Sequence, residues 1–409
     1  MRRRIRRLVA ETPERRTGPN QVQAADGMEG AGTPSEATPS SHRMRRLLDR
    51  LRDIRPVIRL MYDDDPVTRL LCREPLPLTW RRLRFITLTI RAAVYDERIR
   101  FWFKPRKPNG VAIEITNSCN LRCTMCNLIE MKRHPKFMSM EVYRKTVDRC
   151  AELGVTSVRL HTYGETLLHP KLPEMLEYAK ARGLTVWIST NAQLLTGNIA
   201  RRILESGVDF VRYSVEGTSK EVYEKVRVRG EWESLLENIA SFRRLRDEIS
   251  PGTGIGLNTV LMRDTLDGIT GIKGTFGPYV DDIEISALEA LGRAGQKVAA
   301  GQWLENVDMR RRIPCRLLWD MMNVTVDGKA TLCCADLEAE VQVGDALTED
   351  LQSIWRGETL EGIRRSHRRR DFGSDSICSN CSFGITNTAF NRLRYTLLSD
   401  HNQYLNKVR

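Results

Sequence analysis

The sequence predicts an α/β protein: a partial (β/α)6 TIM-like barrel with a helical extension before it and a small cysteine-rich domain after it. Three observations predict this arrangement. Strand-like and helix-like segments alternate from about residue 110 to residue 300, which is typical of βαβ units around a parallel sheet. Beyond residue 300 the alternation stops and half of the ten cysteines follow. Before residue 110, apolar residues recur at helical spacing.

The first 110 residues divide into two predicted parts. Residues 1–43 are rich in Arg, Pro, Ser, Gly and Thr, so we expect a disordered basic tail. Residues 44–109 carry apolar side chains at helical spacing with basic residues between them, so we expect a helical N-terminal extension. Its basic face favours solvent, and a peripheral contact with an anionic membrane surface remains a second possibility.

The barrel, residues 110–300, is predicted from six strands and the helices between them. The strands are expected at residues 111–116, 155–160, 184–189, 210–215, 255–262 and 283–288. Helices are expected at residues 140–153, 173–182, 199–205 and 232–247, and more weakly after residue 264. Six units are too few for the closed eight-stranded barrel, so a curved, open barrel is expected.

Charge and composition exclude several classes of protein. The chain has 409 residues and no apolar run that approaches the ~18–20 residues of a membrane helix, and its Arg-rich start lacks a secretory signal. Of the net charge of +13, most belongs to residues 1–110, which carry 25 Lys and Arg against 13 Asp and Glu. We therefore expect no nucleic-acid partner for the body of the protein.

Three cysteines stand directly after the first predicted strand. Cys119, Cys123 and Cys126 have CxxxCxxC spacing, and three thiolates on a short loop can hold three irons of a cubane while the fourth iron stays open. Clustered cysteines in a reducing compartment usually bind metal or act in catalysis. A zinc knuckle with His134 as fourth ligand, or buried free thiols, are the alternatives.

With this motif the sequence resembles the radical S-adenosylmethionine (SAM) superfamily. The resemblance implies that the methionine part of SAM chelates the open iron of a [4Fe–4S] cluster, and that reductive cleavage releases a 5′-deoxyadenosyl radical. It also implies cofactor contacts. Gly164 and Glu165 match the motif that receives the amino group through an exposed carboxylate or carbonyl, Ser214 matches a residue on the ribose or carboxylate, and Asn258 is a weaker adenosine contact. Met125 replaces the usual aromatic residue against adenine.

The C-terminal cysteines resemble the SPASM and "twitch" auxiliary-cluster domains, most closely the twitch subdomain of an aminocyclitol dehydrogenase. The resemblance implies a SPASM/twitch domain over residues 301–390, a tail over 391–409, and one closed [4Fe–4S] cluster. Its ligands would be Cys315, Cys333, Cys378 and Cys381. Cys334 competes with Cys333, which the spacing after Gly328 favours. A four-cysteine zinc ribbon is the alternative.

These resemblances imply a radical SAM oxidoreductase with two [4Fe–4S] clusters. The expected substrate is a small polar molecule such as a sugar or aminocyclitol, dehydrogenated while the auxiliary cluster accepts an electron. A flavodoxin- or ferredoxin-type donor and a reducing cytoplasm are expected. The catalytic base is not assigned; Arg212, Glu216 and Arg263 are rim candidates only. Alternatives are ribosomal-peptide modification, epimerisation with Cys334 as hydrogen donor, and a non-catalytic iron–sulfur or zinc scaffold.

Overall fold

A computed structural model describes residues 101, 105–303, 312–373 and 376–386. The predicted tails at 1–43 and 391–409, and the predicted helical extension up to residue 100, lie outside the described residues. No helix in the part of the chain that the structure describes is long and apolar enough to span a bilayer.

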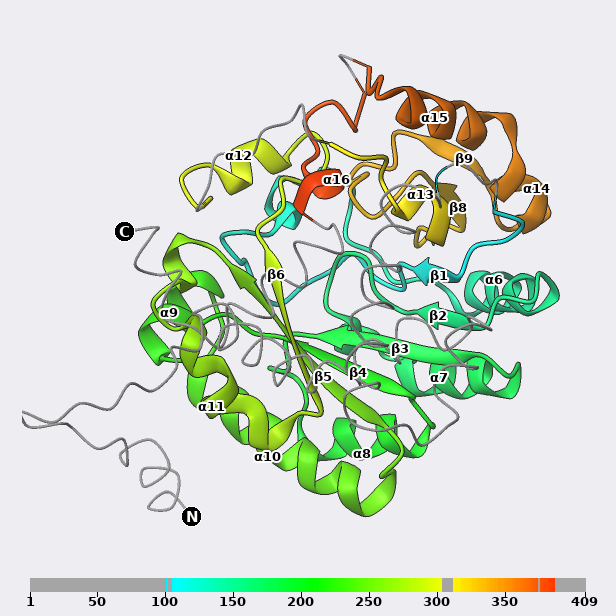
Figure 1. The fold of residues 1–409 in the computed structure, drawn as a ribbon. Helices are drawn as coiled ribbons and strands as arrows, with labels where there is room; N and C mark the ends of the chain where they lie inside the picture. The colour runs from blue at the N-terminus through cyan, green and yellow to red at the C-terminus, as the bar shows by residue number, and fades with distance from the viewer. Residues whose placement is uncertain (1–100, 102–104, 304–311, 374–375, 387–409) are drawn as a thin grey trace, which may run out of the picture. The chain divides into compact units, whose positions relative to one another are not determined.

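The described chain is organised around one nine-stranded sheet, in the order β6-β5-β4-β3-β2-β1-β7-β8-β9. The strands β1 to β7 run parallel to one another, β8 pairs antiparallel with β7, and β9 pairs antiparallel with β8 (Figure 1). Their bounds are β1 Gly110–Ile113, β2 Ser157–Arg159, β3 Thr185–Thr190, β4 Phe210–Ser214, β5 Gly254–Leu261, β6 Asp282–Ala287, β7 Met321–Val324, β8 Lys329–Thr331 and β9 Gln342–Asp345. The predicted open α/β barrel is thereby confirmed, with six strands from the predicted barrel.

Helices connect the strands and cover the outer face of the sheet (Figure 1). They are α6 Met140–Glu152, α7 Leu172–Ala181, α8 Gly197–Glu205, α9 Lys220–Val226, α10 Trp232–Ile249, α11 Ile272–Phe276, α12 Gly295–Ala299, α13 Leu317–Asp320, α14 Leu351–Arg356, α15 Glu358–Arg369 and α16 Phe383–Thr386. Short 3-10 helices are η4 Asn127–Glu130, η5 Thr166–Leu168, η6 Arg263–Thr265, η7 Ile269–Gly271 and η8 Gly277–Tyr279.

The core lies between the sheet and these helices. Strand residues alternate, so that Val158, Ile188 and Val211 are fully buried on the helical face while their chain neighbours face the barrel interior. On α6 the buried positions Tyr143, Val147 and Cys150 recur at helical spacing, and the Ser139 side chain caps the helix by accepting from the Val142 amide. This pattern is why the sequence alone locates the barrel elements.

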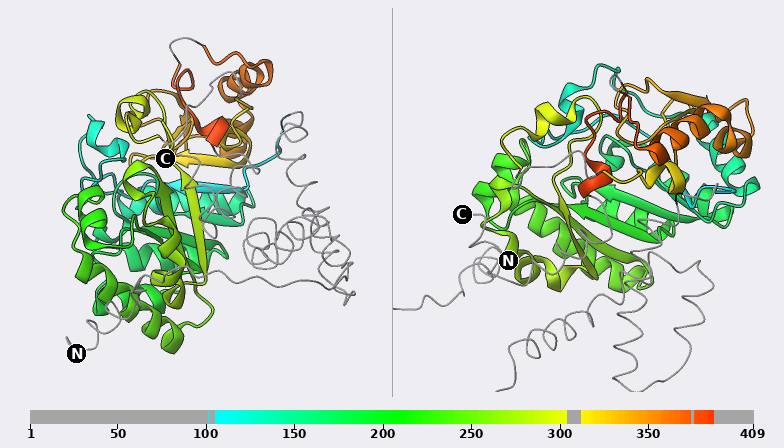
Figure 2. Two further views of the ribbon diagram at one scale, coloured as in Figure 1. Left: turned by 60° about the vertical axis from the view of Figure 1, so that its left-hand side comes forward. Right: turned by 45° about the horizontal axis from the view of Figure 1, so that its top comes forward.

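The C-terminal region continues the barrel sheet. Strand β7 pairs in parallel with β1, with Ala112 opposite Asn323, and β8 and β9 extend the sheet beyond it. Both views of Figure 2 show this region gathered on the β1 side, with α14 and α15 beside it. Arg133 reinforces the junction by a bidentate pair with Glu114 (2.8 and 2.7 Å) and by donating to the Leu337 carbonyl. Sequence periodicity did not foresee this pairing.

Candidate active site and cysteine clusters

The first cysteine loop leaves β1 at the carboxyl edge of the parallel sheet. Two buried polar residues anchor its base: the Thr116 hydroxyl donates to the Lys136 carbonyl (2.8 Å), and the Asn117 amide donates to the His134 carbonyl (3.0 Å). Further along, the amides of Arg122 and Thr124 each donate to a backbone carbonyl of residues 226–228 at 3.0 Å. The loop is thus tied at both ends to segments distant in sequence.

The structure brings Cys119, Cys123 and Cys126 together on this loop. Burial raises the pKa of Cys119 to about 11, with the other two thiols adding to the effect, and burial likewise raises the pKa of Cys123 and Cys126. Thiols with raised pKa must lose protons to bind iron, so cluster assembly here should release protons.

A buried ion pair that the sequence did not predict contacts the cysteine loop through Cys123. Arg227 donates to the Cys123 sulfur (3.4 Å) and also pairs with Glu216, which is fully buried. Burial lowers the pKa of Arg227, but the carboxylate and thiol beside it raise the pKa by more. Arg227 lies beyond α9 in an ordinary Arg-rich turn, so the sequence offered no signal for this contact. A donor on a ligating sulfur is a common outer-shell contact.

Gly164 allows the segment after β2 to pack closely against the start of the cysteine loop. Its φ is +82°, and a Cβ there would lie 2.5 Å from the Thr116 carbonyl oxygen and 2.8 Å from that of Ser118. The next residue, Glu165, donates its amide to the Ser118 carbonyl (2.7 Å). Only glycine permits this approach without strain.

The Glu165 carboxylate is not exposed as predicted. The residue is 2% exposed, and its oxygens accept from the Leu167 amide (3.0 Å), the Thr190 hydroxyl (2.7 Å) and the Asn191 amide (2.8 Å). The carboxylate therefore ties the end of β2 to the end of β3. A backbone carbonyl of this segment, the other acceptor that the sequence allowed, is the group left to receive an amino group.

Three consecutive side chains before Gly164 carry buried polar atoms with no hydrogen-bond partner: His161 Nδ1, Thr162 Oγ1 and Tyr163 OH. Burial and the charges of Arg159 and Arg212 lower the pKa of His161 to about 3, so its ring is neutral at physiological pH. Unpartnered buried polar atoms are rare in folded proteins, and a bound polar ligand is one way to satisfy them. This segment therefore fits a polar cofactor or substrate.

The remaining predicted cofactor contacts lie at the same edge of the sheet. Ser214 ends β4, and Asn258 lies opposite it on β5 and accepts from the Ser286 hydroxyl (2.5 Å). Met125 packs against a small apolar cluster, separate from the main core, that includes Met262 and Leu288. The sequence-predicted contacts thus come from four different loops or strands of the barrel.

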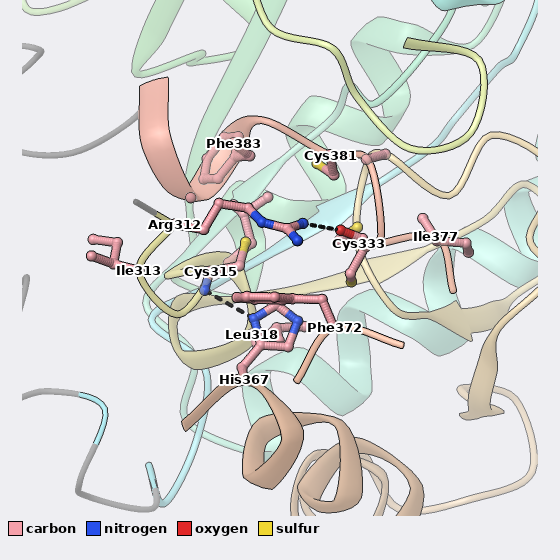
Figure 3. A pocket seen from close by; sticks show the side chains of 14 residues that line it. Arg312, Ile313, Cys315, Leu318, Cys333, His367, Phe372, Ile377, Cys381 and Phe383 are labelled. Atoms are coloured by element: carbon pink, nitrogen blue, oxygen red, sulfur yellow. Dashed lines mark hydrogen bonds between the residues drawn. The ribbon is translucent and has the colours of Figure 1, made fainter. Parts of the chain in front are cut away.

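Four C-terminal cysteines line one cavity, with about 450 Å³ of empty space including its mouth (Figure 3). They are Cys315, Cys333, Cys378 and Cys381. Buried apolar side chains such as Leu318, Ile377 and Phe383 complete the wall of the cavity. Arg312 lies across it over the Phe372 ring (3.9 Å) and donates to the Cys378 carbonyl. Four thiols in a mostly apolar pocket with one cation fit a closed anionic cluster.

Cys334 does not line this cavity. Burial and the neighbouring charge of Glu289 raise its thiol pKa to about 12. Burial raises the pKa of Tyr163, in the segment beside the first cysteine loop, and Cys334 contributes to that rise. Its neighbour Cys333, the ligand that the spacing favours, lines the cavity. Cys150 lies fully buried in the core on α6.

The three rim candidates fall in different places. Glu216 is buried and paired with Arg227, so it is not a rim base, and this prediction was wrong. Arg212 faces the barrel interior and pairs with Glu284 and Asp282. Arg263 donates to the Trp303 carbonyl (3.0 Å). Within the described ranges, no three His, Cys, Asp or Glu side chains converge closely enough to hold a single metal ion.

Comparison with known proteins places two domains on the chain. Residues 113–270 match the model of the radical SAM superfamily, and residues 315–382 match the SPASM iron–sulfur cluster-binding domain. An AdoMet-dependent heme synthase of Oleidesulfovibrio alaskensis is 30% identical over 186 residues, 45% of this chain and 43% of that protein. A GTP 3′,8-cyclase of Chlorobaculum tepidum is 32% identical over 160 residues, 39% and 46% of the two chains.

The chain therefore spans less than half the length of these curated relatives. Among solved structures, Streptococcus suis SuiB bound to its precursor peptide SuiA aligns with a TM-score of 0.54 at 13% identity, over 83% of this chain and 87% of that one. This likeness shows a shared fold. The chain thus carries a radical S-adenosylmethionine domain followed by a C-terminal SPASM domain, which implies SAM and [4Fe–4S] clusters as its cofactors.

Proposed function

We propose that this chain is a radical SAM oxidoreductase that dehydrogenates a small polar, sugar-like molecule. Cys119, Cys123 and Cys126 would hold the cluster that binds SAM, and the four cavity cysteines would hold an auxiliary cluster. When bound, the first cluster and SAM supply a 5′-deoxyadenosyl radical that takes a hydrogen atom from the substrate. The residues of the chain position these groups and exclude water.

The cofactor site is supported by contacts at the carboxyl edge of the sheet. The close approach of Gly164 to the Ser118 carbonyl supports a role for the backbone carbonyls of this segment as acceptors for the SAM ammonium. Ser214 and Asn258 offer polar groups to the ribose, and Met125 offers an apolar, polarizable surface to adenine. Arg227 balances the negative charge on Cys123.

The single observation that carries the dehydrogenation proposal is the cavity lined by four cysteines. Four protein ligands leave no open iron, so such a site serves electron transfer and not substrate binding. A substrate that has lost a hydrogen atom next to a hydroxyl still has one proton and one electron to lose before it becomes a ketone. A protein base would take the proton, and the auxiliary cluster would take the electron, which completes a two-electron oxidation.

Epimerisation is a second candidate, favoured by the position of Cys334 outside the ligand cavity. Its raised pKa keeps the thiol protonated, as a hydrogen-atom donor must be. Such a donor would leave a thiyl radical, which one electron from a ferredoxin-type donor and one proton from solvent would restore to the thiol. Cys334→Ala should abolish epimerisation and spare dehydrogenation.

The first experiment is anaerobic reconstitution with iron and sulfide, followed by an assay for 5′-deoxyadenosine after dithionite reduction. We expect about eight irons and cleavage of SAM. A Cys119/Cys123/Cys126 triple Ala variant should retain about four irons and lose cleavage. A fully loaded protein that forms no 5′-deoxyadenosine would overturn the enzyme proposal; about four irons with cleavage intact would move the C-terminal cysteines to zinc.

Substrate class is tested by deuterium transfer from labelled candidates into 5′-deoxyadenosine. Sugars and aminocyclitols should be screened before peptides. Peptide substrates are nevertheless to be included, because the curated relatives include a PqqA peptide cyclase of Granulibacter bethesdensis. We further propose a flavodoxin- or ferredoxin-type electron donor and a reducing cytoplasm, because thiolate-bound clusters oxidise readily.

A further inference from the structure

A ladder of aromatic and guanidinium groups crosses the inner face of the barrel. The Arg159 guanidinium on β2 lies 5.2 Å from the Trp187 ring centroid on β3, Trp187 stacks on Phe210 of β4 at 4.7 Å, and the Arg212 guanidinium lies 5.3 Å from the Phe210 ring. Cation–π contacts hold one guanidinium at each end of the stacked pair Trp187 and Phe210, which we call the aromatic floor.

Two glycines on β5 make room for the floor. A Cβ at Gly254 would lie 2.5 Å from the Phe210 ring, and one at Gly256 would lie 2.6 Å from it. Because these two positions on β5 carry no side chain, the Phe210 ring occupies the space over them on the inner face of the sheet. Such a surface suits the apolar face of a sugar ring.

The two guanidinium groups, those of Arg159 and Arg212, differ in whether a carboxylate pairs with them. Arg212 pairs with Glu284 and Asp282. For Arg159, no carboxylate oxygen of the described residues lies within 4.0 Å. Among the charged groups that act on Arg159, the strongest influence is that of another guanidinium, Arg316, whose Nε is buried without a hydrogen-bond partner. Burial lowers the pKa of Arg159, and the like charges of Arg316 and Arg212 lower it further, while Glu284 and Asp320 oppose this.

A buried amide shares the same layer of the sheet. Asn323 on β7 lies opposite Ala112 of β1, which in turn lies opposite Arg159, so only a small side chain separates the two polar ones. Asn323 is 3% exposed, and both its Nδ2 and its Oδ1 are buried without a partner. An unsatisfied buried amide is destabilising, and a bound polar ligand would remove that cost.

We propose that Arg159, Arg316 and Asn323 form a subsite for an oxyanion, a carboxylate or phosphate group of the substrate. Two guanidinium groups that have no ion-pair partner among the described residues call for a negative partner, and guanidinium matches both oxyanions bidentately. This inference rests on the proposed function and narrows it. The substrate is an anionic sugar derivative, a sugar acid, sugar phosphate or sugar nucleotide, and not a cationic aminocyclitol.

The subsite residues are neighbours in sequence of segments at both cysteine sets. Arg159 is two residues before His161, in the segment that leads to Gly164, and Arg316 directly follows the cavity residue Cys315.

The test is thermal unfolding of the reconstituted protein, kept anaerobic, in rising inorganic phosphate or malonate at constant ionic strength. A ligand of the native state raises the Tm in proportion to the logarithm of its concentration above Kd. The native protein should show this rise with at least one anion. Arg159→Gln and Arg316→Gln should each lose it, Arg159→Lys should keep part of it, and the exposed Arg201→Gln should keep all of it.

Without anions, Arg159→Gln should unfold at the same Tm as the native protein or higher, because it removes an uncompensated charge. A rise with phosphate alone would indicate a phosphorylated sugar or sugar nucleotide, and a rise with malonate alone a sugar acid. The proposal is overturned if neither anion raises the native Tm, if Arg159→Gln keeps the full rise, or if it unfolds at much lower temperature without anions. Failure of the proposed function shows separately, as absence of 5′-deoxyadenosine from the native protein.

Discussion

Gly164 does two things that no other residue type can do there: it adopts a left-handed backbone and lets two carbonyls approach. We expect Gly164→Ala to lower the free energy of unfolding by more than about 3 kcal/mol, since backbone strain and overlap with the Thr116 carbonyl add together. Denaturant unfolding measures the loss. Gly183→Ala is the matched control, because Gly183 has φ +74° with nothing near its Cβ position, and should lose only about 1–2 kcal/mol. Equal losses would contradict the close approach.

Glu216 and Arg227 form a buried pair whose members depend on each other. Arg227→Gln leaves the Glu216 carboxylate buried without its cation and should cost about 3–5 kcal/mol of unfolding free energy. The double variant Glu216→Gln/Arg227→Gln should cost less than Arg227→Gln alone. A double-mutant cycle measures the difference. Additive losses would show that the pair is not coupled.

Cys333 and Cys334 are adjacent in sequence, yet only Cys333 lines the cavity. Cys333→Ala should therefore remove about four of about eight irons from the reconstituted protein, whereas Cys334→Ala should keep all of them. Iron and sulfide analysis with absorption spectra of both variants measures this. The reverse result would exchange their roles.

At the scale of single elements, His169 joins η5 to the start of α7. Its Nε2 bonds to the Met138 carbonyl (3.0 Å) and its Nδ1 accepts from the Lys171 amide (3.2 Å), which requires the neutral ring. Burial lowers its pKa below the ordinary 6.5. As the pH falls through 6.5, the unfolded chain takes up a proton that the folded protein does not, so the free energy of unfolding falls.

We therefore expect the stability advantage of the native protein over His169→Gln to shrink from about pH 7 to about pH 5. Urea unfolding at each pH measures it. His134→Gln, at an exposed histidine, is the control and should leave the pH dependence unchanged. An advantage that does not change with pH would show that His169 is not held neutral.

At the scale of the whole molecule, one sheet unites the barrel with the cysteine-rich region. A chain that ends at Trp303 would lose β7 and leave β1 as an unpaired edge beside a core built for it. We expect this truncated chain to aggregate or to bind a hydrophobic dye strongly. A Cys315/Cys333/Cys378/Cys381 quadruple Ala variant keeps β7 and should stay monomeric while losing iron. A soluble, monomeric truncated barrel would contradict this dependence.

The local pattern of side chains was enough to locate the six barrel strands, the main helices and both cysteine sets. Val158 and Ile188 are buried and alternate with neighbours that face the barrel interior, and α6 repeats its buried residues at helical spacing. Each of these elements can therefore be predicted from a few consecutive residues. The cysteine spacing after β1 and the residues after Gly328 likewise sufficed to expect two clusters.

Only the tertiary structure decided which distant groups meet. Nothing local distinguishes Glu216, a buried partner of Arg227, from a carboxylate on the rim, or shows that Glu165 would be enclosed by three donors. The pairing of β7 with β1 and the approach of Arg316 to Arg159 join residues more than 150 positions apart. The periodicity of apolar residues shows which side of a segment is buried and which faces solvent. Charge pairing and strand order depend on contacts that form only when the whole chain has folded.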